Sequence, residues 1–254
     1  MKQTKDFLLE ENVRFNDNYS LLKLATADGL PLPEIKPGQF VQVAVEAPGV
    51  FLRRPISINN VESGDKLSLL VRRAGRGSSA LLDMPKGTVV NLLFPLGNGF
   101  SLDVAPGARV LLAGGGVGVA PLLYLGRCLE KAGLKPEYLI GARSAADLLQ
   151  LDVLERIGKV HICTEDGSAG IKGLVTAHPV LAEKIDRIYC CGPAPMMKAI
   201  AAIARERNID CEVSLENMMA CGLGACLCCV EKTVKGNVCV CTEGPVFNIN
   251  QLTW

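Results

Sequence analysis

The first hundred residues alternate between apolar and polar positions with a period of two, which is typical of strands with one buried face. Val41, Val43 and Val45 share one face of such a segment. Two further strand-like runs follow at residues 65–75 and 87–97, and glycine or proline bounds each of them. Because no long helical pattern interrupts these runs, they predict a small antiparallel β-barrel.

The pattern changes near Pro106, after which apolar runs and helical patterns alternate. Buried strands are predicted at residues 108–116, 136–143, 159–166 and 186–193, and helices at residues 120–133 and 195–208. Alternation of this kind predicts a parallel α/β domain. A short cysteine-rich tail follows.

The predicted fold class is therefore α+β and multidomain. Residues 1–103 are expected to form the barrel, residues 104–212 the α/β domain and residues 213–254 a small C-terminal domain. Hydrophobic residues make up 49% and charged residues 21% of the 254 residues, which indicates a packed soluble protein. The net charge of +1, with scattered Lys and Arg, gives no electrostatic footprint for nucleic acid.

Two features bear on location. Residues 110–126 carry no charge, but this run is shorter than the roughly 20 residues of a spanning helix and contains several glycines. A buried strand, a turn and the start of a helix explain it better. The charged residues 1–15 lack the apolar core of a secretory signal, so the chain is expected to be cytoplasmic, with reduced thiols.

Six of the 11 cysteines lie between residues 221 and 241. Cys221, Cys226 and Cys229 have the spacing C-x4-C-x2-C, which is that of plant-type [2Fe-2S] proteins. A loop that brings four thiolates to one small cluster must bend sharply, and Gly222 and Gly224 give its backbone that freedom.

Other assignments of these cysteines remain open at this point. A zinc site is the strongest rival, although zinc sites usually combine two close cysteine pairs, whereas disulfides are unusual in a cytosolic chain. The fourth ligand is Cys239 or Cys241, which would face the same side of a strand. Cys228 would point elsewhere. His161 and His178 are expected to be ordinary surface or partly buried residues.

Gly114, Gly115, Gly116 and Gly118 lie between a predicted strand and a predicted helix, where a nucleotide pyrophosphate often binds. The G-x-G-x-x-G fingerprint does not match, and residues 143–144 are Arg and Ser where an acidic residue would be expected. A purely structural glycine turn is the alternative.

Four sequence blocks occur in a fixed order: RPIS at 54–57, GRGS at 75–78, GGGVGVAP at 114–121 and CGPAPMM at 191–197. Together they resemble the ferredoxin–NADP reductase superfamily, in which a β-barrel binds flavin and an α/β domain binds a nicotinamide nucleotide. The block from residue 218, MMACGLGACLCCVEKT, with the later VCVCTEGPVF, is similar to the electron-transfer subunits of type B dihydroorotate dehydrogenase.

This resemblance implies specific cofactor contacts. Arg54 would pair with the FAD pyrophosphate and Ser57 would hydrogen-bond the isoalloxazine edge, whereas Ile56 stands where many reductases have a stacking Tyr. The residues expected to bind FAD are Arg54, Pro55, Ile56, Ser57, Leu70, Val71, Arg72, Gly77 and Ser78. Those expected to bind NAD are Gly114, Gly115, Gly116, Gly118, Cys191, Gly192 and Pro193. The family's fourth ligand opens a C-x-x-G-P turn, so the implied ligands are Cys221, Cys226, Cys229 and Cys241, with Cys239 spare.

The resemblance also implies a function. Electrons from dihydroorotate would leave the FMN of a catalytic partner subunit, pass through the [2Fe-2S] cluster and FAD, and reduce NAD+, with no side chain needed as acid or base. The complex would be a heterotetramer of two plus two subunits. A related reductase subunit of the glutamate-synthase-like or bifurcating transhydrogenase type, and a non-enzymatic zinc-binding module, are the alternatives. NAD and NADP remain undistinguished, since Arg143 could meet a 2′-phosphate.

Overall fold

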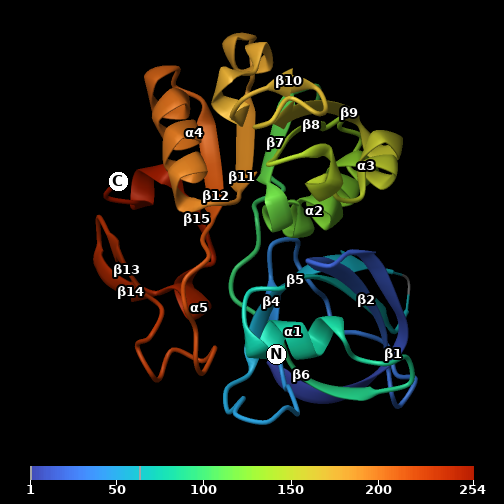
Figure 1. Cartoon of the computed structure of the whole chain (residues 1–254). Coiled ribbons are helices and arrows are strands. Elements are labelled where there is room, and N and C mark those ends of the chain that lie inside the picture. Colours follow the sequence, from blue (N-terminus) through green and yellow to red (C-terminus); the bar gives the residue numbers. More distant parts are fainter. Residues whose placement is uncertain (1, 63) are drawn as a thin grey trace. The chain divides into compact units, whose positions relative to one another are not determined.

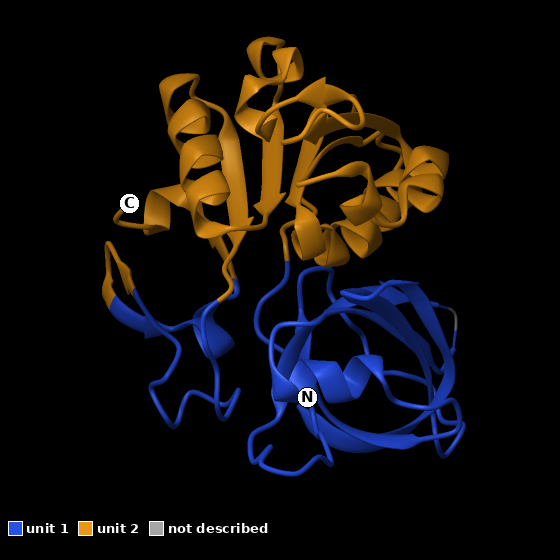
Figure 2. Ribbon diagram, in the orientation of Figure 1, with its two compact units in different colours: residues 1–99, 217–231, 237–245 blue, residues 100–216, 232–236, 246–254 orange. Residues whose placement is uncertain are grey.

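The computed structural model describes residues 2–62 and 64–254 (Figure 1). The chain divides into two compact units (Figure 2). Unit 1 comprises residues 1–99, 217–231 and 237–245, and unit 2 comprises residues 100–216, 232–236 and 246–254. The C-terminal region is thus shared between the units, with most of the cysteine-rich segment in unit 1. The three-domain division of the chain remains a prediction.

Unit 1 is built on a closed antiparallel barrel with the strand order β1-β2-β5-β4-β3-β6, which confirms the predicted architecture. The strands are β1 (Gln3–Asn16), β2 (Tyr19–Thr26), β3 (Phe40–Val43), β4 (Arg54–Val61), β5 (Lys66–Arg72) and β6 (Val89–Leu96). Pairing of β1 with β6 closes the barrel. Phe7 and Phe94 meet edge to face in its core, with ring centroids 5.2 Å apart.

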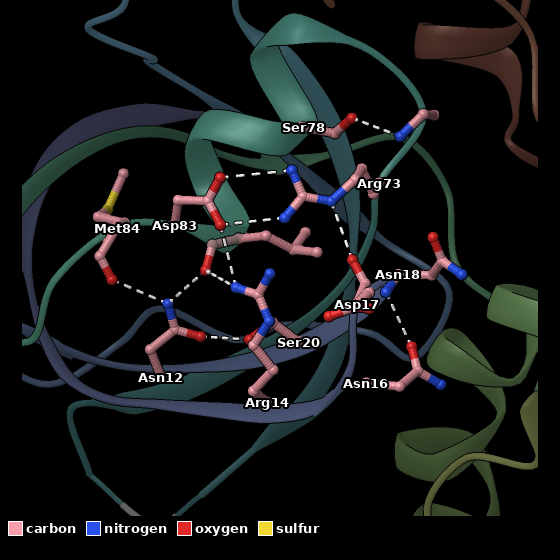
Figure 3. Close-up of polar contacts among 12 residues, drawn as sticks. Asn12, Arg14, Asn16, Asp17, Asn18, Ser20, Arg73, Ser78, Asp83 and Met84 are labelled. Carbon is pink, nitrogen blue, oxygen red and sulfur yellow. Dashed lines mark hydrogen bonds and ion pairs between the residues drawn. The ribbon is translucent and has the colours of Figure 1, made fainter. Parts of the chain in front are cut away.

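A short helix, α1 (Arg76–Leu82), interrupts the barrel strands after β5. Its C-terminal end is anchored by polar contacts (Figure 3). The Asp83 carboxylate accepts hydrogen bonds from Arg73 and Arg14, each at 3.0 Å for the shortest contact. The Asn12 Nδ2 donates to the main-chain oxygens of Leu82 and Met84. These contacts fix the C-terminal end of α1, the helix whose first turn carries the GRGS motif.

Unit 2 contains a sheet with the strand order β10-β9-β8-β7-β11-β12-β15. Its strands are β7 (Val110–Gly115), β8 (Glu137–Ala142), β9 (Lys159–Thr164), β10 (Ile171–Lys172), β11 (Arg187–Cys191), β12 (Asp210–Ser214) and β15 (Val246–Asn248). Neighbouring strands are parallel except β15, which runs antiparallel to β12 at one edge. The predicted parallel α/β domain is confirmed, with this antiparallel edge strand added by the C-terminal segment.

Helices α2 (Ala120–Lys131) and α4 (Ala194–Glu206) coincide with the predicted helices, and both pack on β11. The remaining helices are α3 (Leu151–Ile157), α5 (Val240–Glu243), and the 3₁₀ helices η1 (Gly116–Val119), η2 (Ala145–Asp147), η3 (Val175–Ala177), η4 (Pro179–Ala182) and η5 (Ile249–Gln251). A two-stranded sheet of β13 (Val230–Thr233) and β14 (Gly236–Cys239) completes the structure. Among residues 2–62 and 64–254, no helix has the length and apolar character needed to cross a bilayer.

The two histidines belong to a polar cluster at the amino ends of the parallel strands. The Glu137 carboxylate lies 2.6 Å from Arg109 Nε and 2.8 Å from His161 Nε2. The His161 ring meets the His178 ring with centroids 4.9 Å apart, and His178 Nδ1 accepts from the Val180 N–H. Both histidines are partly buried, in line with the prediction, and both have structural contacts here.

This cluster predicts a pH-dependent stability. The Arg109 hydrogen bond lowers the pKa of Glu137 from 4.5 to about 2. A depressed folded-state pKa stabilises the fold above the unfolded pKa, and that stabilisation is lost as the pH falls toward the folded value. We expect Glu137→Gln to lower the free energy of unfolding by about 1–2 kcal/mol at pH 7. Denaturant titrations should show this difference shrinking between pH 4.5 and pH 2.

Asp152→Asn is the matched control, because its ion pair with Arg156 is 3.6 Å long and exposed. Such a pair contributes little, so this variant should unfold within about 0.5 kcal/mol of the wild type at both pH values. An E137Q deficit that is the same at pH 7 and pH 3 would contradict the assignment of the acid sensitivity to Glu137.

Candidate functional site

The cysteine loop runs from Cys221 to Cys229 and lies against the barrel in unit 1. Gly222 and Gly224 have φ values of +71° and +83°, which confirms that the loop requires glycine to bend. A Cβ on Gly222 would lie 2.8 Å from Gln42 Cγ, and one on Gly224 would lie 2.9 Å from Thr242 Cγ2. The loop is thus held closely between strand β3 and helix α5.

Backbone N–H groups point at the sulfurs of three predicted ligands. The Leu223 N–H donates to Cys221 Sγ at 3.3 Å, and the Gly224 N–H donates to Cys241 Sγ at 3.2 Å. The Cys241 N–H donates to Cys229 Sγ at 3.4 Å. Such donors favour thiolate over thiol, and thiolate is the form that binds metal. The loop therefore places N–H donors where they would stabilise cysteine thiolates bound to a metal.

Cys239 and Cys241 differ in position, although both follow the same hairpin. Cys239 ends strand β14, whereas Cys241 lies in helix α5, so they do not share one face of a strand. Cys241 is fully buried beside Cys229 and receives the Gly224 N–H, whereas Cys239 Sγ faces the Gly224 main-chain oxygen at 3.8 Å. A carbonyl oxygen opposes a thiolate, so the surroundings favour Cys241 as the ligand.

The thiols of this loop differ in acidity. The Leu223 N–H, with further donors from Cys226 and Ala225, lowers the pKa of Cys221 to about 6. Burial raises the pKa of Cys241 to about 12, so this thiol would release its proton only when a metal binds the sulfur. Cys226 and Cys228 are exposed. The four candidate ligands thus differ in burial: Cys226 is exposed, Cys221 is half-buried, and Cys229 and Cys241 are buried.

In the described part of the chain, no three His, Cys, Asp or Glu side chains converge on one metal position. A [2Fe-2S] cluster distributes its four cysteines over two irons, so its ligands need not meet at a single point. The donor set and the N–H···S contacts fit such a cluster.

The RPIS and GRGS motifs meet in unit 1. Arg54 begins β4, and Gly77 lies in the first turn of α1. A Cβ on Gly77 would lie 2.2 Å from Arg54 Nε, so the guanidinium occupies the space that a side chain would fill. Arg54 Nη1 donates to the main-chain oxygen of Leu52 at 2.7 Å, which fixes the group in place. The structure thus presents a cation beside the backbone of the GRGS turn, a pair suited to a pyrophosphate.

The other predicted flavin residues fall into two groups. Pro55, Ile56 and Ser57 are half-buried on β4, where a ligand can still cover them. Leu70 and Val71 are buried in the barrel, and Arg72 is exposed. The β4–β5 ladder ends at Leu69, so the backbone of residues 70–72 lies beyond that pairing and can contact a ligand.

The Ser78 hydroxyl is engaged within its own turn. It accepts from the N–H groups of Ala74 and Gly75, at 2.8 and 3.0 Å, and donates to the Gly75 oxygen. Ser78 therefore shapes the turn. Any hydrogen bond from this turn to a phosphate would come from backbone N–H groups.

The predicted nucleotide residues gather at the carboxyl edge of the parallel sheet in unit 2. Gly114 in β7 is in register with Cys191 in β11, and Cys191 is in register with Ser214 in β12. Open α/β sheets bind nucleotides at this edge. Burial, followed by the Glu216 charge, raises the pKa of Cys191, so this thiol stays protonated. Cys191 therefore adds no charge of its own to this edge.

The glycines of this turn have packing reasons for lacking side chains. A Cβ on Gly118 would lie 2.3 Å from the Cys191 oxygen, and one on Gly115 would lie 2.5 Å from Met196 Sδ. Gly116 has a φ of +55°. The GGGVG turn and the CGP turn at Gly192 are thus fitted against each other, which places both motifs at one site.

One residue of the cluster region was missed by sequence reasoning. Gln42 lies in β3 against the cysteine loop, fully buried. A single polar residue between two valines is expected to lie on the solvent-exposed face of a strand. The segment that covers it begins some 175 residues later, so no local signal could have identified it.

Comparison with known proteins identifies close relatives. A family model described as the iron-sulfur cluster binding domain of dihydroorotate dehydrogenase B matches residues 216–253. The dihydroorotate dehydrogenase B (NAD(+)) electron transfer subunit of Shouchella clausii (strain KSM-K16) is 42% identical over 227 residues, covering 85% of this chain and 86% of that protein. The subunit of the same name from Fusobacterium nucleatum subsp. nucleatum is 36% identical over 254 residues, covering 96% of each.

Solved structures agree on the fold. The NADH-dependent reduced ferredoxin-NADP oxidoreductase, studied for flavin-based electron bifurcation, superposes with a TM-score of 0.86 at 26% identity, covering 98% of this chain and 90% of its own. The flavohem-like FAD/NAD binding domain of nitric oxide dioxygenase from Vibrio cholerae O1 biovar El Tor gives a TM-score of 0.70 at 23% identity, covering 82% of this chain and 98% of its own. A ferredoxin reductase-like fold with a barrel and a parallel sheet is therefore confirmed.

Proposed function

The chain belongs to the family of dihydroorotate dehydrogenase B electron transfer subunits, and we propose that it performs this family's reaction with the residues described above. It is an oxidoreductase subunit that uses FAD, a [2Fe-2S] cluster and NAD. When bound, the cluster supplies one-electron transfer and FAD couples it to the two-electron chemistry of NAD+. The protein supplies placement and electrostatics, with no acid or base side chain assigned.

The cluster is assigned to Cys221, Cys226, Cys229 and Cys241. The observation that carries this assignment is the set of three backbone N–H groups directed at Sγ atoms of Cys221, Cys229 and Cys241. These donors disperse thiolate charge and hold the sulfurs in position. Cys239, which faces a carbonyl oxygen, and the exposed Cys228 are left out of the ligand set.

FAD is assigned to the barrel surface around Arg54 and Gly77, with Pro55, Ile56, Ser57, Leu70, Val71, Arg72 and Ser78 completing the site. Arg54 pairs with the pyrophosphate beside the backbone of the turn at Gly77. Ser78 acts by holding that turn in shape. Because the barrel, the cysteine loop and Cys241 all belong to unit 1, electrons can cross between FAD and the cluster within one compact unit.

NAD+ is assigned to the carboxyl edge of the parallel sheet, at Gly114, Gly115, Gly116, Gly118, Cys191, Gly192 and Pro193. The two turns pack without side chains between them, and Gly116, which is half-buried, and Pro193, which is exposed, are the members of this set open to a dinucleotide. The buried, protonated Cys191 adds no negative charge next to the phosphates.

The relatives' name implies a catalytic dihydroorotate dehydrogenase partner. We infer that this partner carries FMN, that the complex contains two copies of each subunit, and that it resides in the cytoplasm. The exposed apolar side chains of Met218, Leu223 and Leu227, which are 83, 49 and 64% exposed, lie around the cysteine loop and suit a docking surface for the partner. Electrons would then enter beside the cluster.

The test is anaerobic purification with and without the coexpressed partner. We expect about two irons and one FAD per chain, and NAD+ reduction by dihydroorotate only when the partner is present. A chain that oxidises dihydroorotate alone would overturn the assignment of substrate oxidation to the partner. A colourless zinc-containing chain would overturn the redox assignment.

A further inference from the structure

Gln42 is a fully buried polar side chain. Its exposure is 0%, and among the described residues neither Nε2 nor Oε1 has a hydrogen-bond partner. Leaving a buried polar group unpaired costs about 1–3 kcal/mol. Buried amides in native proteins therefore nearly always have a partner. We therefore expect the Gln42 amide to have a hydrogen-bond partner in the region of the cysteine loop.

The amide is directed toward the cysteine loop. Alternation along β3 places Gln42 on the opposite face from Val41 and Val43. Gln42 Cγ and Nε2 lie 2.8 and 3.2 Å from the position that a Cβ would take on Gly222. Gly222 directly follows the assigned ligand Cys221, so the donor end of the amide lies against the loop that holds the sulfurs.

The other side of Gln42 adjoins the flavin strand. In the β3–β4 ladder, Gln42 is in register with Pro55 of the RPIS motif. Its main-chain oxygen accepts a hydrogen bond from Arg53 Nη1 at 3.1 Å. Gln42 thus lies between the strand assigned to FAD and the loop assigned to the cluster, inside unit 1.

The chemistry of sulfur determines which atom of the Gln42 amide can form a hydrogen bond with the cluster. Thiolate and sulfide sulfurs accept hydrogen bonds and have no proton to donate, whereas Nε2 is a donor. We propose that Gln42 Nε2 donates a hydrogen bond to a sulfur of the [2Fe-2S] centre and thereby raises its reduction potential. This rests on the proposed function. A donor stabilises the added negative charge of the reduced centre, and hydrogen bonds to sulfur are one determinant of such potentials.

The direct test replaces the amide by an apolar group of similar length, Gln42→Met, in the complex with the catalytic subunit. The cluster's midpoint potential is measured by a redox titration followed by electron paramagnetic resonance. We expect the ratio of reduced to oxidised cluster at a fixed potential to fall about tenfold, which for one electron is a shift of 59 mV toward lower potential. The g-values of the reduced signal should change as well.

Leu96→Val is the matched control. Leu96 Cδ1 lies 3.1 Å from the same Cβ position on Gly222, so this variant loosens the same contact without removing a donor. We expect its potential to equal that of the wild type. Gln42→Asn keeps a donor one methylene further away and should give an intermediate value. A wild-type potential in Q42M, or equal shifts in Q42M and L96V, would overturn the proposal.

If Q42M does not bind the cluster, a second measurement, made on the wild-type protein, tests the same hydrogen bond. Wild-type protein labelled with ¹⁵N at glutamine side-chain amides should show a nitrogen coupling to the reduced cluster in pulsed paramagnetic resonance, and its absence would overturn the proposal. Iron and flavin analysis of the same wild-type sample distinguishes a failure of the proposed function from a failure of the Gln42 proposal alone. A sample that lacks iron overturns the proposed function, whereas an iron-containing sample without the coupling overturns the role of Gln42 alone.

Discussion

Replacement of Cys241 by alanine is expected to abolish cluster binding. Cys241 Sγ is buried beside Cys229 and receives the Gly224 N–H at 3.2 Å, so the variant removes both a ligand and the loop's contact with α5. Iron and acid-labile sulfide per chain should fall at least tenfold, since even loss of a residue that merely orients a ligand costs about 10–100-fold in metal affinity. NAD+ reduction by dihydroorotate in the complex should fall at least as far.

NADH oxidation by ferricyanide through FAD provides an internal reference, because that route bypasses the cluster. It should persist in C241A, which would show that the barrel and the sheet remain folded. Cys239→Ala is the matched control, with a cysteine only two positions away and a sulfur that faces the Gly224 oxygen. C239A should retain its iron. The reverse result, with iron lost from C239A and kept in C241A, would assign the fourth ligand to Cys239.

The spacing of the cysteines could not decide between these two residues. Two positions apart on a strand they would be equivalent, but β14 ends at Cys239 and the chain turns into α5 before Cys241. The difference in their surroundings comes from Gly224 on the preceding cysteine loop, which offers its N–H to the Cys241 sulfur and its oxygen to the Cys239 sulfur. Local sequence defines the set of candidates, and tertiary contacts distinguish them.

Most of the larger strands and helices have a local sequence signal, whereas several short elements depend on contacts with distant segments. Alternating or continuous apolar runs predict strands β3, β5, β6, β7, β8, β9 and β11, and helical patterns predict α2 and α4. Helix α1 is only seven residues long, too short for a periodic signal, and it depends on anchors such as Asp83 with Arg73. Strand β15 is formed by three residues near the C-terminus that pair with β12. Its existence follows from a long-range pairing that no local pattern encodes.

The burial of Gln42 in the cluster region is likewise not predicted by the local sequence. Its burial is produced by the C-terminal segment and not by its own strand, so the sequence pattern around it predicts the opposite exposure. The Arg54–Gly77 contact is intermediate: both motifs can be identified in the sequence, but only the structure shows that the glycine's missing side chain makes room for the guanidinium.

Replacement of Arg54 by methionine, which keeps the length of the stem and removes the charge, is expected to weaken FAD binding by about 10–100-fold. A charge-assisted hydrogen bond contributes about 1.5–3 kcal/mol, and the guanidinium is the cation assigned to the pyrophosphate. Titration of the apoprotein with FAD, followed by flavin fluorescence, measures the change. Lys23→Ala serves as a charge control, since Lys23 forms only a surface pair with Glu11 and should leave FAD affinity unchanged.

A pair of glycine variants then separates the position of the guanidinium from its presence. In Gly77→Ala, the new Cβ would lie 2.2 Å from Arg54 Nε, so the guanidinium must move, and we expect FAD to bind about tenfold more weakly. Gly75→Ala changes the same turn, but a Cβ there meets no atom within 4 Å and the backbone is extended at φ −179°. G75A should bind FAD as the wild type does. If G77A also bound FAD normally while R54M did not, Arg54 would act through its charge at a distance, because a direct pairing with the pyrophosphate requires the guanidinium to stay in place.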